Sequence, residues 1–128
     1  MNSNRFAAIG AFLGGLAVML GAFGAHAIKD RVSAADLEIW KTGAHYHLIH
    51  AVALLALAVN DKKGSYRVVC WLWIAGIAIF GGSLYALVLS QVRVFGAITP
   101  IGGLCLIIGW LMLGIKLWKG NESTLDQA

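Results

Sequence analysis

Acidic side chains are scarce in this sequence. It contains six Asp and Glu residues, and none of them falls inside an apolar run. Paired carboxylates and hydrolytic triads are absent, and the glycine-rich stretches lie in apolar runs, where they indicate close helix packing rather than a phosphate loop. The sequence therefore favours a protein that is not an enzyme.

Charged residues of either sign are also few, at 12% of the 128 residues, whereas 59% are apolar. This leaves too little polar surface to cover a soluble domain. Apolar runs of about 20 residues cross a bilayer core of about 30 Å as helices, and about four of them fit in this length. We therefore expect one transmembrane domain, residues 1–128, whose main partner is the lipid bilayer.

Cysteine and proline are rare. Cys70 and Cys105 lie in apolar runs near opposite membrane faces, which argues against a disulfide, and neither has a partner at metal-site spacing. The single proline, Pro100, follows Thr99, and this pair predicts the capped start of a helix.

Four apolar runs predict an all-α integral membrane four-helix bundle with short loops. The expected helices cover about residues 6–27, 33–60, 68–90 and 99–119, and a polar tail follows at 120–128. Ser33 and Asp36 match the [ST]-x-x-[DE] start of a helix. The residues from there to Thr42 mix polar and apolar types, so we expect an interfacial extension, with the membrane part of this helix beginning near residue 45.

Positive charge indicates the orientation. Four spans place both termini on one side, where six Lys and Arg residues stand against four on the other. This bias favours the bacterial cytoplasmic (inner) membrane with both termini in the cytoplasm. Because the charges lie almost wholly between the apolar runs, and no basic helix is present, we expect no nucleic acid partner. The six are Arg5, Lys62, Lys63, Arg67, Lys116 and Lys119, and the four are Lys29, Arg31, Lys41 and Arg93.

Glycines recur on one face of the first run. Gly10, Gly14 and Gly21 belong to a series at three- and four-residue steps, which lets a neighbouring backbone approach closely. Packing within the chain is the favoured interpretation, and a homo-oligomer through the same face is the alternative.

Histidines gather at the start of the second run. The purely apolar stretch behind them, Leu48 to Val59, is only about 12 residues long, which is too short to span. The helix must therefore take the histidines into the membrane or its boundary. His47 and His50 lie about 60° apart on one face of the helix, and His45 points toward nearly the opposite face.

Polar or backbone-irregular positions of all four runs fall in the same leaflet. At about 1.5 Å per residue, His50 and Tyr85 lie roughly 7 Å inside the outer face, Ser83 roughly 10 Å, and His26 and Pro100 within about 3 Å of the edge. We therefore predict a ligand-binding cluster near the outer face, made of His26, Lys41, His50, Ser83 and Tyr85.

Three interpretations of this cluster stay open. An ionisable side chain inside a membrane favours a functional site, for a small ligand, a proton or a lipid headgroup. Neutral histidines also serve as interhelical hydrogen-bond partners. A zinc or copper site of His26, His47 and His50 is the third, although their spacing is not the i, i+4 pair of metalloprotease helices and no carboxylate lies within a span. No cofactor is predicted on this basis.

Four motifs, taken together, resemble a known family. They are Gly21–His26, Trp40–Gly43 with Tyr46 and His50, Gly82–Tyr85, and Thr99–Gly103. In order and spacing they are similar to the YgdD/YwdK-type small membrane proteins, catalogued as domain of unknown function four-two-three. The resemblance covers nearly the whole chain and implies a four-helix integral membrane protein, but it transfers no activity. It supports His26 and His50 more firmly than His45 and His47.

These observations favour a non-enzymatic accessory or small-ligand or lipid-binding protein of the membrane. An oligomeric small-solute or proton-coupled transporter is one alternative, and it needs an oligomer because four helices leave little room for a central pathway. A membrane metal-binding protein is the other.

Overall fold

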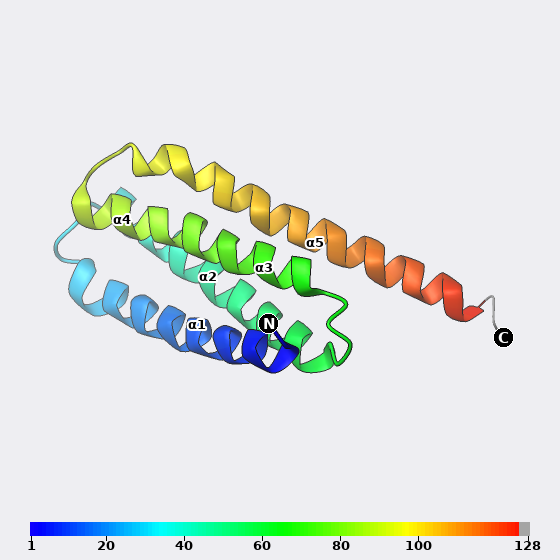
Figure 1. Cartoon of the computed structure of the whole chain (residues 1–128). Helices are drawn as coiled ribbons and strands as arrows, with labels where there is room; N and C mark the ends of the chain where they lie inside the picture. The colour runs from blue at the N-terminus through cyan, green and yellow to red at the C-terminus, as the bar shows by residue number, and fades with distance from the viewer. Residues whose placement is uncertain (126–128) are drawn as a thin grey trace.

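The structure, a computed structural model, describes residues 1–125, with side chains described through Gly120. Within that range every regular element is helical (Figure 1). Two short π-helical segments, η1 and η2, continue or join longer helices, so the chain forms four rods. The elements are α1 (Ser3–Phe23), η1 (Gly24–Ile28), α2 (Ala34–Asn60), α3 (Arg67–Gly76), η2 (Ile77–Gly81), α4 (Gly82–Ser90) and α5 (Phe95–Leu125).

All four rods are long and apolar enough to cross a bilayer. The candidate spans are Ser3–Ile28, Ala34–Asn60, Arg67–Ser90 and Phe95–Gly120, and the shortest has 24 residues. At about 1.5 Å per residue even that rod exceeds a hydrocarbon core of about 30 Å. The predicted all-α, four-helix membrane architecture is confirmed.

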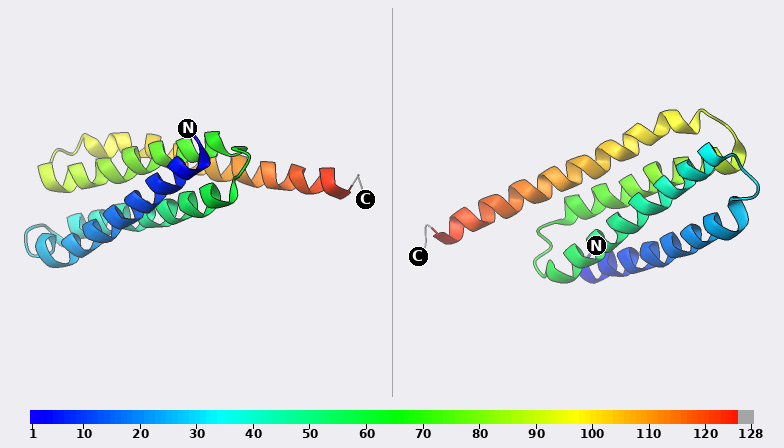
Figure 2. Two further views of the ribbon diagram at one scale, coloured as in Figure 1. Left: turned by 60° about the horizontal axis from the view of Figure 1, so that its bottom comes forward. Right: turned by 180° about the vertical axis from the view of Figure 1, so that it is seen from behind.

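The rods pack as two antiparallel hairpins (Figure 2). In the first hairpin, α1 packs along α2. In the second, α5 packs along the rod made of α3, η2 and α4. The two hairpins meet where α2 packs against that same rod. The N-terminus and the 61–66 loop lie at one end, called here the amino-terminal end. The loops 29–33 and 91–94 lie at the other, the distal end (Figure 1).

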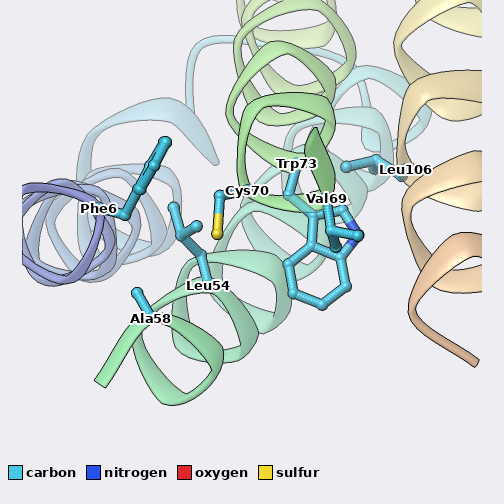
Figure 3. Packing of buried hydrophobic residues seen from close by; sticks show 7 residues of the cluster. All are labelled: Phe6, Leu54, Ala58, Val69, Cys70, Trp73 and Leu106. Atoms are coloured by element: carbon cyan, nitrogen blue, oxygen red, sulfur yellow. The ribbon is translucent and has the colours of Figure 1, made fainter. Parts of the chain in front are cut away.

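The largest buried cluster joins all four rods in the half of the molecule nearer the amino-terminal end (Figure 3). Because lipid tails are as apolar as these side chains, burial away from water contributes little inside the membrane, and close packing must stabilise the contacts. The cluster comprises Phe6, Leu54, Ala58, Val69, Cys70, Trp73 and Leu106.

Two glycines allow backbones to touch. A Cβ added at Gly10 would lie 2.8 Å from the Leu55 nitrogen on α2, and one added at Gly102 would lie 2.8 Å from the Phe80 Cα in η2. Gly10 is therefore used for packing within the chain. Gly21, in contrast, has nothing within 4 Å of its added Cβ.

Helix α5 starts earlier than the sequence led us to expect. It begins at Phe95, and Pro100 lies inside it instead of at its first position. The first turn is closed by i→i+3 hydrogen bonds, among them Phe95 N to Val92 O at 3.3 Å and Gly96 N to Arg93 O at 3.0 Å. Since proline lacks an N–H, the helix loses one backbone hydrogen bond there. The helix also continues through Leu125, so the expected polar tail is partly helical, and its residues 126–128 lie outside the described part.

Candidate functional site

His50 lies on the buried side of α2, and its side chain bridges two rods. It is 4% exposed, and its Nδ1 lies 2.7 Å from the Tyr46 carbonyl oxygen one turn earlier. The Trp110 indole on α5 donates to its Nε2 at 3.0 Å. An indole N–H can only donate and a carbonyl can only accept, so the two contacts fit the neutral ring with its hydrogen on Nδ1.

His47 faces a different partner. Its Nδ1 lies 3.2 Å from the Tyr85 hydroxyl oxygen on α4, and the side chain is 3% exposed. Its Nε2 makes no hydrogen bond of normal geometry to residues 1–120, whose side chains the structure describes. The Tyr85 ring packs on Trp40 with centroids 4.8 Å apart, and Trp40 donates to the Leu20 carbonyl on α1 at 2.8 Å. The structure thus pairs Tyr85 with His47 rather than with His50.

Ser83 joins α4 to α5. Its hydroxyl lies 2.7 Å from the Thr99 hydroxyl and donates to the Phe80 carbonyl at 3.0 Å. A polar side chain inside the bilayer needs such partners because lipid offers none. Ser83 therefore forms a separate contact from those of His47 and His50.

The remaining two predicted residues lie at the surface. His26 is exposed in η1. Lys41 is exposed on α2, with its Nζ 2.7 Å from Glu38 Oε1 on the same helix. The five residues expected to form one cluster are therefore distributed over separate surroundings.

The histidines named for a zinc or copper site are not gathered either. Among the described residues, no group of three His, Cys, Asp or Glu side chains is placed to hold a metal ion. His26 is exposed, whereas His47 and His50 bond to different helices. The described residues thus offer no built metal site.

A groove opens beside His50. It has a volume of about 570 Å³ and lies between α2, η2 and α5. Its rim residues Ile49, Ile107 and Trp110 are 44%, 55% and 45% exposed, on helices long enough to span a bilayer, so the groove opens toward lipid. The lining residues are Thr42, Tyr46, Ile49, His50, Phe80, Gly103, Leu106, Ile107 and Trp110.

Aromatic rings form much of the groove wall. The ring centroids of Tyr46 and Phe80 lie 5.3 Å apart. The Tyr46 ring also stacks on His50, with centroids 6.2 Å apart and ring planes at only 17°. The ring centroid of Trp110 lies 6.0 Å from that of His50 and 4.7 Å from that of Trp73. Such a wall offers flat, polarisable surface with few free polar atoms.

Sequence reasoning missed Trp110 and Phe80. A signal existed for Trp110, because it lies in the middle of an apolar run rather than at an interface, and an indole N–H inside the membrane requires an acceptor. Histidine Nε2 is one of the few acceptors that helices of this composition offer. Phe80 gives no comparable signal among so many apolar residues.

Two buried aspartates were also missed as contact residues. At the distal end, Asp36 is 4% exposed and accepts hydrogen bonds from Arg93 Nη1 at 3.0 Å and Gln91 Nε2 at 3.1 Å. Its backbone N–H donates to Ser33 Oγ at 3.1 Å, which confirms the predicted cap. At the amino-terminal end, Asp61 accepts from the backbone N–H groups of the two residues that precede α3, both at 2.8 Å.

Comparison with known proteins identifies the family. Residues 20–103 match the model of a protein family of unknown function, DUF423. The UPF0382 membrane protein SSP2132 of Staphylococcus saprophyticus is 45% identical over 116 residues, covering 89% of this chain and 97% of that protein. The UPF0382 membrane protein YwdK of Bacillus subtilis is 44% identical over 118 residues, covering 89% and 96%. No solved structure is significantly similar. The expected resemblance is confirmed, and the chain belongs to the DUF423 family of membrane proteins.

Proposed function

We propose that this membrane protein is a non-enzymatic binding protein for an amphiphile dissolved in the bilayer, whose apolar body occupies the groove between α2, η2 and α5. The observation that carries this proposal is the groove itself, whose size of about 570 Å³ falls in the range of small-molecule sites. Its opening faces lipid, so an occupant enters from the membrane rather than from water.

The chemistry of the lining supports an apolar occupant. Both nitrogens of His50 are already engaged, by Tyr46 and Trp110, and Thr42 Oγ1 donates to the Glu38 carbonyl at 2.8 Å. Few polar groups therefore remain to bind a polar solute or an ion. Ring faces and aliphatic side chains contribute most of the contact, by dispersion.

Filling the groove tests the proposal. A Cβ at Gly103 would lie 3.7 Å from the Phe80 ring, which is ordinary contact, so Gly103→Leu directs its larger side chain into the groove without a backbone clash. The matched control is Gly15→Leu on α1, where nothing lies within 4 Å of an added Cβ.

The measurement is photolabelling of the full chain in nanodiscs with palmitic acid that carries a diazirine, read by peptide mass spectrometry. We expect labels on Tyr46 and Ile107 in the wild type and in Gly15→Leu, and about a tenfold loss in Gly103→Leu, equivalent to about 1.4 kcal/mol. A parallel arm with an isoprenoid quinone carrying the same group shows whether a planar ring is preferred. Labelling of the groove that is unchanged in Gly103→Leu would contradict the proposal.

A further inference from the structure

The distal end carries a second cavity, remote from the groove and different in chemistry. It has a volume of about 780 Å³ and lies between η1, the 29–33 loop and the end of α4. Its apolar lining includes Phe23, Val88 and Leu89, and its charged lining includes Asp30, Arg31 and Arg93. Apolar side chains and opposite charges therefore meet at the level where helices leave the membrane.

Two of these charges have no counter-ion in the described chain. Among residues 1–120, whose side chains the structure describes, the ion pairs are Lys41 with Glu38 and Arg93 with Asp36, so neither Asp30 nor Arg31 is paired within that range. Arg93 uses its Nη1 for Asp36 and keeps a 63% exposed side chain, which leaves its other N–H donors for a ligand.

We propose that this cavity binds the headgroup of a phosphatidylethanolamine-type phospholipid. Arginine matches a phosphate with two parallel N–H donors, so Arg31 and Arg93 bind the phosphate. A carboxylate accepts charge-assisted hydrogen bonds from a primary ammonium, so Asp30 binds the ethanolamine nitrogen. Phe23, Val88 and Leu89 contact the first part of the acyl chains. The Asp36–Arg93 ion pair holds one of the two arginines in place.

The opposite end of the molecule makes a useful contrast. Its cavity of about 510 Å³ is lined by Lys62, Lys63 and Arg67 and by no acidic residue. A purely basic surface suits anionic lipids. The mixed charge of the distal cavity is what selects a zwitterionic headgroup with a free ammonium.

Binding of defined phospholipids to the full chain in detergent, followed by native mass spectrometry, tests the assignment. The lipids carry identical acyl chains and differ only in headgroup, so occupancy of the lipid-facing groove contributes equally to all. We expect ethanolamine to bind about tenfold tighter than choline, because the trimethylated nitrogen has no N–H to donate, and one charge-assisted hydrogen bond is lost. Phosphatidylglycerol, which has no ammonium group, should bind no better than the choline lipid.

Variants assign the roles of the two unpaired charges. Asp30→Asn should remove the preference for ethanolamine over choline, and Arg31→Gln should weaken both about tenfold. Lys29→Gln, a neighbour that does not line the cavity, is the matched control and should bind like the wild type. Circular dichroism and elution volume confirm that each variant is folded. Equal binding of ethanolamine and choline lipids by the wild type, or tightest binding of phosphatidylglycerol, would overturn the assignment, whatever the outcome at the groove.

Discussion

A neutral histidine inside a membrane helix has two ring nitrogens to satisfy, and His50 satisfies both within the protein. One hydrogen bond stays within α2, at Tyr46, and the other reaches Trp110 on α5. α2 and α5 otherwise pack mainly on the helices between them. The hydrogen bond between His50 and Trp110 therefore connects the two hairpins directly.

A double-mutant cycle measures how much this hydrogen bond contributes to stability. His50→Phe and Trp110→Phe each remove the interhelical hydrogen bond and keep a ring, and we expect a coupling free energy of about 1 kcal/mol in reversible unfolding from mixed micelles. The control pair is His45→Phe with Trp110→Phe, because His45 is exposed and has no contact with Trp110. Strictly additive effects of His50→Phe and Trp110→Phe would show that the bond does not stabilise the fold.

The sequence names the polar residues of the bundle interior but not how they pair. His47 and His50 are both buried, yet Tyr85 lies against His47, while His50 bonds to Trp110 and Ser83 to Thr99. Pairing depends on how each helix is rotated, and lipid-facing and protein-facing residues here are equally apolar. Rotating α2 by about 60° about its axis would place His50 instead of His47 opposite Tyr85, and no residue pattern fixes that rotation.

Between helices, the contact of α5 with η2 depends on glycine. Gly102 lies so close to Phe80 that an added methyl group would overlap the backbone. The sequence predicted close packing through Gly10, Gly14 and Gly21 of the first helix, and of these Gly10 meets a neighbouring backbone whereas Gly21 does not. It gave no sign of the contact at Gly102, nor that the backbone opposite is π-helical, because that widened turn is set by packing.

Two alanine substitutions on α5 should therefore differ in their effect on the free energy of unfolding. Gly102→Ala should destabilise the protein by about 1–3 kcal/mol, because overlap with the η2 backbone forces the helices apart. Gly114→Ala, on the same helix with nothing within 4 Å of its added Cβ, should be neutral or stabilise by up to about 1 kcal/mol through helix propensity. Unfolding in mixed micelles measures both. Equal destabilisation by the two would mean that loss of glycine, not the contact with Phe80, matters.

For the molecule as a whole, the basic residues at the two ends of the bundle determine the expected orientation in the membrane. The N-terminus and the 61–66 loop lie together at the amino-terminal end, where Arg67 donates to the Met1 carbonyl at 3.0 Å and Lys116 to the Ser65 carbonyl at 2.9 Å. The distal end has the mixed cavity instead. The number of Lys and Arg residues at each end therefore predicts which end faces the cytoplasm.

The margin of six Lys and Arg residues against four is small, so orientation should respond to two charges. A green fluorescent protein fused after Ala128 should fluoresce and alkaline phosphatase at the same site should be inactive, as expected for a cytoplasmic C-terminus. Lys62→Gln with Lys63→Gln reduces six to four and should give a mixture of both orientations. The matched control, Lys29→Gln with Lys41→Gln, widens the difference to six against two and should leave only the fluorescent orientation. An active phosphatase in the unaltered chain would reverse the assignment of the two ends and place the distal cavity in the cytoplasmic leaflet.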